Sequence, residues 1–282
     1  METKVSSATK EVIIGPNRPT VLIGEQINPA GRKKLSQSLK AGDMDVLKSE
    51  AIVQVEAGAD ILDVNVSTFG IDETELLPRA LKAVMEAVDS PLCIDSPNPE
   101  ALAEALKVYE GKPLLNSVSG EEQSLKKVLP LVKEYGTAVI ALLQDDEGLP
   151  KNADRRVSIA HKIVNRATAE GIPCEDIVID CLAFAVGAYN DSGLVLLETI
   201  GRIQAELGVN MVLGTSNISF GLPDRALLNN SFVCMVIAAG VNCHIVNVSQ
   251  IRPAVLAADL IMGRDNHARR YVGEFRQRRL IH

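Results

Sequence analysis

Eight short aliphatic segments recur along the chain, and each is followed by a stretch of helical character. The segments are VLIGEQIN from Val21, ADILDVNV from Ala59, SPLCIDS from Ser90, PLLNSVS from Pro113, TAVIALLQ from Thr137, DIVIDCLA from Asp176, NMVLGTSN from Asn210 and VNCHIVNV from Val241. They are rich in β-branched residues and almost continuously apolar, which is typical of parallel strands covered on both faces. Eight strand–helix units in 282 residues predict an α/β fold, a TIM (β/α)8 barrel.

The stretches between these segments carry helical start and stop signals. Helices are predicted from Asp43 to Gly58, after Ile71, over 124–135, from Asp154, over 192–208, over 224–240, and from Pro253 to near Gly263. An open doubly wound sheet is the competing architecture, but the first segment is not followed by the GxGxxG turn typical of that fold. We therefore expect one domain over residues 1–282, with a basic C-terminal segment over 264–282.

Composition narrows the classes of function. The net charge of −7 and the aromatic content of 3%, with no Trp, disfavour binding to nucleic acids and to anionic membranes. The five cysteines form no CxxC pair, which predicts free thiols in a reducing compartment. The N-terminus has no apolar signal segment and no stretch could span a bilayer, so a cytoplasmic protein is expected.

Polar side chains stand at the carboxyl ends of the predicted strands, where TIM barrels carry their active sites. They are Glu25, Asn28, Asp63, Asn65, Asp95, Ser96, Asn116, Ser117, Gln144, Asp145, Asp180, Ser216, Asn217 and Asn247. Carboxylates and carboxamides suit a planar heterocycle with a guanidine-like edge, whereas a phosphate needs Lys, Arg or a glycine-rich nest. The alternative is that each residue merely caps the helix that follows it.

No metal site is predicted. The four histidines form no HExxH motif and no pair with a nearby cysteine, which disfavours zinc. A Mg²⁺ site is possible from the carboxylates, but these lie on different strands. His244 alternates with apolar residues in the last strand and is expected to be a core histidine with satisfied hydrogen bonds.

Five stretches stand in a characteristic order and spacing. They are IGEQINPAG (23–31), LDVNV (62–66), CIDSPNPEALAEALKVYEGKPLLNSVSG (93–120), VIDCLAF (178–184) and VLGTSNISFGLPDRALLN (212–229). Together they resemble the pterin-binding methyltransferases, specifically the methyltetrahydrofolate:corrinoid-protein methyltransferase family. The resemblance is collinear from about Val21 to the C-terminus. It implies a TIM barrel, usually a homodimer, with the pterin in the mouth of the barrel.

The resemblance also implies roles for individual residues. Asp95, Asn116 and Asp180 match the family's residues that hydrogen-bond the pterin ring. Asn217 matches the catalytic Asn that faces N5 of the folate. The loop that carries it is completed by Gly214 and Ser216, and Arg225 matches a family Arg that follows this loop. For Arg225, a plain surface charge at a helix start is an equal alternative.

By this resemblance the chain is an enzyme, a methyltransferase that moves a methyl group between the cobalt of a corrinoid protein and N5 of tetrahydrofolate. This would serve one-carbon metabolism or a demethylation pathway. Tetrahydrofolate or 5-methyltetrahydrofolate would be the substrate, and a partner corrinoid protein would carry the cobalamin. The same residues would stabilise the transition state in either direction.

Three alternative functions are considered, and the sequence departs from the family's pattern at several positions. A dihydropteroate-synthase-like condensing enzyme needs a basic residue just after Ser216, where this chain has Asn217. A zinc methyltransferase lacks its ligands, and a non-catalytic folate-binding subunit would keep the pterin contacts. Departures include Gln26, where many relatives have Arg, and the acidic segment LLQDDEGLP (142–150). The C-terminal arginines Arg264, Arg269, Arg270, Arg276, Arg278 and Arg279 predict either a solvated helix or contact with an acidic partner or neighbouring subunit.

Overall fold

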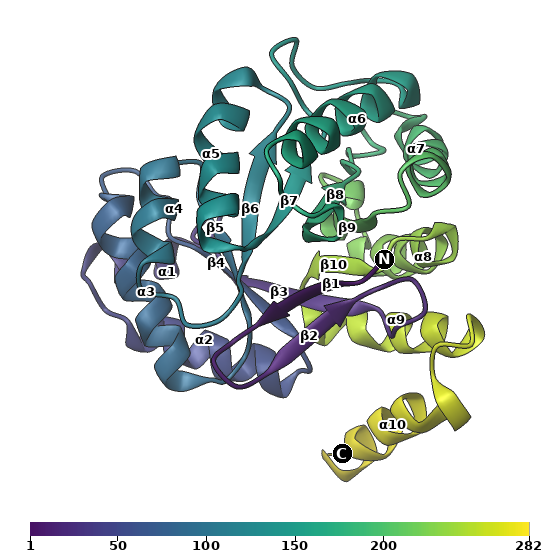
Figure 1. The fold of residues 1–282 in the computed structure, drawn as a ribbon. Coiled ribbons are helices and arrows are strands. Elements are labelled where there is room, and N and C mark those ends of the chain that lie inside the picture. The colour runs from purple at the N-terminus through teal and green to yellow at the C-terminus, as the bar shows by residue number, and fades with distance from the viewer. Residues whose placement is uncertain (282) are drawn as a thin grey trace.

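The computed structural model describes residues 1–281, and the side chains of residues 1–277, and contains a closed barrel of parallel strands (Figure 1). The strands are β3 (Val21–Ile27), β4 (Ile61–Asn65), β5 (Leu92–Asp95), β6 (Leu114–Ser119), β7 (Ala138–Leu142), β8 (Ile177–Asp180), β9 (Asn210–Gly214) and β10 (Cys243–Val246). Each strand pairs with its successor, and β10 pairs with β3 to close the barrel. The predicted single-domain TIM barrel and its eight strand segments are confirmed.

Helices surround the barrel. They are α1 (Lys33–Lys40), α2 (Asp45–Glu56), α3 (Glu73–Ala87), α4 (Pro99–Leu106), α5 (Glu122–Tyr135), α6 (Ala153–Ala169), α7 (Ser192–Glu206), α8 (Arg225–Ala239) and α9 (Val248–Ile261). A last helix, α10 (Arg269–Ile281), extends away from the barrel (Figure 1). The predicted start of α9 was wrong, because the helix begins at Val248 and contains Pro253. Val248 and Ile251 are buried in the outer core, and this burial offsets the hydrogen bond that proline removes. Within residues 1–281, no helix is both long and apolar enough to cross a membrane.

A hairpin that the sequence analysis did not predict precedes the barrel. Its strands, β1 (Thr3–Ser6) and β2 (Glu11–Ile14), pair antiparallel. Val5, Val12 and Ile14 are buried in one cluster with side chains from inside the barrel, such as Ile23 and Ile61. Figure 1 shows the hairpin lying across the barrel. Because Val21 follows the hairpin closely and begins the first barrel strand, the hairpin closes the amino end of the barrel and leaves the carboxyl end for a site.

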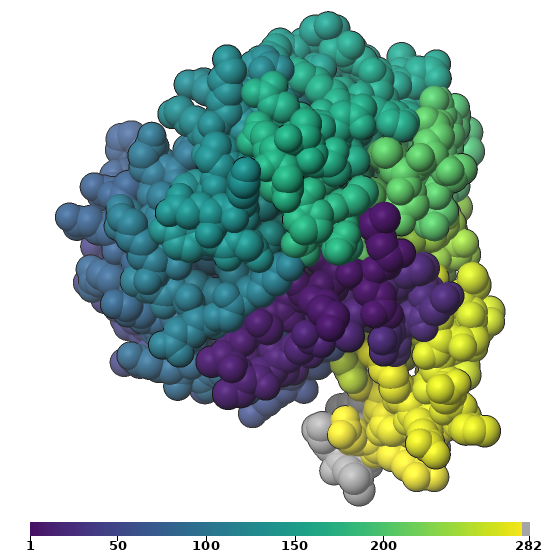
Figure 2. Space-filling model, viewed as in Figure 1, coloured from purple at the N-terminus to yellow at the C-terminus, as the bar shows by residue number. Residues whose placement is uncertain are grey.

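A buried ion cluster fixes the last part of the chain to this amino end. Asp259 on α9 is fully buried and accepts hydrogen bonds from the backbone N–H of Thr20 (2.9 Å) and from its hydroxyl (2.6 Å). Arg270 lies 3.0 Å and Arg264 3.7 Å from the same carboxylate. The side chain of Asp259 therefore joins α9, the start of β3 and the base of α10, a helix that protrudes from the body of the molecule (Figures 1 and 2).

Asp259→Asn is expected to lower the free energy of unfolding by about 3 kcal/mol, because two partly buried guanidinium groups lose their counter-charge. Urea denaturation followed by circular dichroism measures this. The matched control is Glu11→Gln, whose partner Lys4 lies 3.7 Å away on the exposed surface. That variant should change stability by no more than about 0.5 kcal/mol. Equal effects of the two substitutions would contradict the assigned role of Asp259.

Candidate active site

The carboxyl ends of β5, β6 and β8 bring together three residues expected at the site. Asp95 ends β5 and is in register with Asn116 on β6, and Asp180 ends β8. All three side chains are half-buried. They lie at the same end of the barrel, opposite the hairpin, so their carboxylate and carboxamide groups face one mouth.

Two further residues on β4 orient this set. Asn65 donates a hydrogen bond from Nδ2 to Oδ2 of Asp95 at 2.9 Å, and Asn116 donates to Oδ1 of Asp63 at 3.3 Å. Burial, together with the neighbouring Asp95 carboxylate, raises the pKa of Asp63 well above its usual value. Burial also raises the pKa of Asp95 to about 6, against the hydrogen bond from Asn65. Asp63 and Asn65 are predicted from the sequence to lie at a strand end, but no sequence signal indicates their positioning role.

A buried arginine holds the loop next to Asp180. Arg156 on α6 is 1% exposed, and its Nη1 donates to the carbonyl oxygens of Cys181 and Leu182, both at 2.9 Å. Its guanidinium lies 4.7 Å from the centre of the Phe184 ring. Leu182 has a φ of 62°, a conformation that non-glycine residues rarely adopt. The role of Arg156 was not predicted from the sequence. The only available signal was a charged residue on an otherwise apolar helix face.

The other side of the mouth is the turn η2 (Thr215–Ser219), which follows β9. Arg225, at the start of α8, donates to the carbonyl oxygen of Ser216 at 2.8 Å and to the hydroxyl of Ser219 at 3.0 Å. A Cβ atom on Gly214 would lie 2.9 Å from Nδ2 of Asn217, so glycine permits that amide to fold back over the end of β9. Arg225 therefore fixes the turn that carries Asn217, and it is more than a surface charge at the start of a helix.

Glu25 joins this turn to the first barrel strand. The hydroxyl of Ser216 lies 3.3 Å from its Oε1. Burial raises the pKa of Glu25, against the hydrogen bonds from Ser216 and from the backbone of Asn247. The site thus contains four carboxyl groups, Glu25, Asp63, Asp95 and Asp180, whose pKa values lie above their usual range because the barrel shields them from water.

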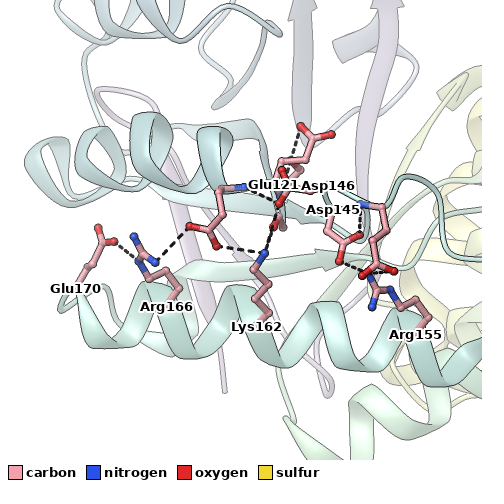
Figure 3. Close-up of polar contacts among 11 residues, drawn as sticks. Glu121, Asp145, Asp146, Arg155, Lys162, Arg166 and Glu170 are labelled. Atoms are coloured by element: carbon pink, nitrogen blue, oxygen red, sulfur yellow. Dashed lines mark hydrogen bonds and ion pairs between the residues drawn. The ribbon is translucent and has the colours of Figure 1, made fainter.

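The acidic loop after β7 is neutralised by α6 (Figure 3). Arg155 lies 2.7 Å from Asp145 and 2.8 Å from Glu147, and Lys162 lies 3.8 Å from Asp146. The unexpected acidity of this loop therefore serves to bind it to the next helix. Beside the loop lies a cavity of about 370 Å³, lined partly by Ser117 and Gln144.

His244 is a core residue beside the turn that carries Asn217. His244 is fully buried, and its Nδ1 lies 2.8 Å from the hydroxyl of Thr215, while Nε2 has no hydrogen-bond partner among the side chains of residues 1–277 or the described backbone. The expected core position is confirmed, but its hydrogen bonding is only half satisfied. All five cysteines are free thiols, as predicted. Among the side chains that the structure describes, no three His, Cys, Asp or Glu groups are placed to hold a metal ion.

Large apolar side chains are exposed around the mouth. We call them the rim: Phe69, Leu149, Tyr189, Leu194, Phe220 and Leu227. They lie in the loops after β4, β7, β8 and β9 and in the first turns of α7 and α8. Phe69 is 94% and Phe220 70% exposed. Exposed apolar groups that surround a polar pocket are typical of a surface that receives a partner.

Sequence comparison identifies relatives of known activity. The family model described as pterin binding enzyme matches residues 24–247. The chain is 32% identical over 264 residues to a methylcorrinoid:tetrahydrofolate methyltransferase of Eubacterium limosum, with 91% of this chain and 96% of that protein covered. It is 30% identical over 265 residues to a methionine synthase of Mycobacterium tuberculosis, where it spans 89% of its own length but 22% of that protein.

Structural comparison finds the same barrel. Dihydropteroate synthase from Xanthomonas albilineans with 4-aminobenzoic acid gives a TM-score of 0.72 at 19% identity, covering 92% of this chain and 98% of that one. The enzyme from Yersinia pestis with a pterine-sulfa conjugate gives 0.70 at 14% identity, covering 93% and 100%. At these identities the likeness concerns the fold alone.

Arg156→Met keeps the length of the side chain but leaves the carbonyl groups of Cys181 and Leu182 without donors. We expect the free energy of unfolding to fall by about 2–4 kcal/mol, since an orphaned buried acceptor costs about 1–3 kcal/mol. Urea denaturation measures it. Arg155→Met is the control at the neighbouring position, where the partly exposed arginine pairs with Asp145 and Glu147. It should cost about 1 kcal/mol or less, and a loss as large as that of Arg156→Met would refute the assignment.

Proposed function

The chain belongs to the pterin-binding enzymes and is a methyltransferase, and from this premise we propose that it moves a methyl group between the cobalt of a corrinoid protein and N5 of tetrahydrofolate. The observation that carries the proposal is the mouth itself. Asp95, Asn116 and Asp180 offer acceptors and an amide to a guanidine-like ring edge. The Asn217 turn follows β9, which is next to the strand of Asp180 and opposite the strand of Asp95 in the barrel. A condensing reaction on a pyrophosphate would need a cation just after Ser216, and the chain has none until Arg225.

Asp95 and Asp180 act as positioning groups in this proposal. Their oxygens accept hydrogen bonds from the amino group and ring N–H of the pterin, while Asn116 both donates and accepts. The ring is thereby held with N5 toward Asn217. Such fixing of the reacting atoms removes much of the entropic cost of bringing them together.

The chemistry at N5 is one displacement that runs in either direction. When tetrahydrofolate accepts the methyl group, the N5 lone pair attacks the methyl carbon and the cobalt–carbon bond breaks. Both electrons of that bond stay on the metal, so Co(III) becomes Co(I), and N5 loses its proton. In the reverse direction, Co(I) attacks the methyl carbon, and N5 keeps the electron pair and gains a proton.

Asn217 and Glu25 have separate roles at N5 in this proposal. When N5 is the leaving group, the Asn217 amide donates a hydrogen bond that strengthens as the N5 lone pair develops, which stabilises the transition state more than the ground state. A carboxamide cannot exchange the proton itself. Glu25, with its raised pKa and its contact to Ser216, is the group we assign to hold that proton.

The partner is a corrinoid protein that carries the cobalamin, and the rim is the surface we assign to it. The cobalt must reach the methyl group at the mouth, so the partner has to cover the loops that bear Phe69, Tyr189 and Phe220. One-carbon metabolism or a demethylation pathway would use the reaction. A homodimer and a cytoplasmic location remain predictions.

A spectrophotometric assay tests the function. Purified protein is mixed with methylcobalamin and tetrahydrofolate, and separately with Co(I) cobalamin and 5-methyltetrahydrofolate, while the cobalt absorption bands are followed. Turnover in either mixture supports the proposal. Folate binding without turnover on free cobalamin, followed by turnover on a methylated corrinoid protein, supports it with a strict need for the partner. Absence of folate binding would refute it.

Asn217→Ala is expected to lower kcat by about 100-fold to 1000-fold, because one donor to the developing lone pair is lost. The exposed position of Asn217 predicts an unchanged unfolding midpoint. The same assay measures the rate, and calorimetry measures folate affinity, which should change little. Activity equal to that of the unmodified protein would remove Asn217 from the mechanism.

Folate affinity is expected to fall at acid pH. Asp95 and Asp180 have pKa values of about 6 in the free protein and must be ionised to accept from the pterin. Binding should therefore be constant above about pH 7 and weaken by up to about tenfold per pH unit for each carboxyl below about pH 6. Calorimetry between about pH 8 and pH 5 measures this. Asp180→Asn should bind more weakly at high pH and show a shallower decline, whereas a flat profile in the unmodified protein would contradict the assignment.

A further inference from the structure

A groove of about 600 Å³ lies between α1 and α2, outside the mouth. Its walls include Arg32, Lys33 and Lys34 at the start of α1, and Val46 and Val53 on α2. Val53 is 60% exposed although it is apolar. Cationic groups thus stand beside an apolar wall, a combination that suits an anion carried on a chain of methylene groups.

Two lysines in this groove are unpaired. Lys33 and Lys34 are exposed, and neither forms an ion pair with an acidic side chain among residues 1–277. Arg32 differs from them, because its Nη2 lies 2.6 Å from Glu50 and the two groups neutralise each other. Asp45 is then the one acidic group left in the wall against two free ammonium groups. The balance of charge in the groove therefore favours anions.

Contacts with two loops place α1 at the edge of the mouth. Arg32 donates a hydrogen bond to the carbonyl oxygen of Gln26, near the carboxyl end of β3. The hydroxyl groups of Ser36 on α1 and Thr68 lie 2.9 Å apart, and Thr68 directly precedes the rim residue Phe69 in the loop after β4. The helix is thus fixed beside the carboxyl ends of β3 and β4, so the groove lies next to the mouth.

The orientation proposed for tetrahydrofolate directs its tail to this side of the barrel. The tail leaves the ring at C6, which is next to N5 and across the ring from the guanidine-like edge. That edge is held at Asp95 and Asn116. N5 faces Asn217 and Glu25, so the tail departs over β9, β10 and β3, which are neighbours in the barrel. The tail therefore leaves the mouth on the side of the strand that α1 follows.

We propose that the groove between α1 and α2 binds an oligo-γ-glutamate tail of the folate, with Lys33 and Lys34 as the partners of its carboxylates. This inference rests on the function proposed above. Each γ-linked glutamate adds one carboxylate and two methylene groups, and Val46 and Val53 offer these methylene groups an apolar surface. Lysine suits such a chain, because its ammonium group is a mobile point charge that does not require one fixed geometry.

The second cavity beside the mouth, of about 370 Å³, suits the tail less well. Residues that follow β5 and β6 line it, so it lies next to the strands that hold the guanidine-like edge. Lys127 is the one cation among its lining residues, and it lies 3.5 Å from Glu100. Glu121 also lines this cavity and would repel a carboxylate. Position and charge thus both favour the groove at α1.

Calorimetry on the full chain tests the inference with 5-methyltetrahydrofolate in its monoglutamate and triglutamate forms. At low salt the triglutamate should bind about tenfold more tightly, because each exposed ion pair contributes a modest factor. The double variant Lys33→Gln/Lys34→Gln should lower the ratio of the two affinities to about one. Both side chains are exposed, so the circular dichroism spectrum should be unchanged. Raising the salt to about 0.5 M should reduce the ratio in the unmodified protein.

Lys126→Gln/Lys127→Gln is the matched control, because it removes two adjacent lysine charges from α5, beside the second cavity. Its ratio should stay at about ten. Equal affinities for the two forms in the unmodified protein would overturn the inference and leave the proposed methyl transfer intact. An unaltered ratio in the Lys33→Gln/Lys34→Gln variant would overturn it as well. An equal loss in the control would also do so, since the overall charge would then account for the effect. Binding of neither form would overturn the proposed function together with this inference.

Discussion

The pairing of β10 with β3 is the contact on which both the fold and the site depend. It joins Cys243 to Val21 and Val246 to Gly24 across the whole length of the chain. Without this pairing, β3 and β10 would be the two unpaired edges of an open sheet, and β9, which pairs with β10, would lie far from β3. With it, β3 and β9 both flank β10, and Glu25 meets Ser216 although 191 residues separate them. Barrel closure therefore assembles the half of the mouth in which the proposed proton exchange takes place.

The aliphatic filling of the barrel sets the electrostatics of this mouth. Side chains such as Ile23, Ile61 and Val212 occupy the interior beneath the polar residues. Carboxylates above such a layer lose water on one side, and the neutral amides of Asn65 and Asn116 restore only part of that solvation. The carboxyl groups consequently titrate nearer to neutrality than free ones do. A ligand that brings its own N–H donors supplies the missing hydrogen bonds, so the same desolvation favours a pterin-like ring edge over an anion.

Sequence patterns predicted the features that are local and missed those that depend on distant contacts. The eight strands were found because a parallel strand buried on both faces is a continuous apolar run, whatever it pairs with. The placing of Asp95 and Asp180 at strand ends follows from the same runs, whereas their roles came from the family resemblance. The hairpin strands are four residues each, too short to show a periodic pattern. Arg156 could not be recognised, because its partners at 181 and 182 belong to another unit of the barrel.

Charged residues perform opposite tasks at the two ends of the barrel. At the mouth, burial keeps carboxyl groups available to a ligand, and the loops that surround them end in an exposed apolar rim. At the amino end, Asp259 is saturated by Thr20 and two arginines, and the ion pairs turn the apolar side of α10 outward. The two exposed apolar surfaces are thus separated by the length of the barrel.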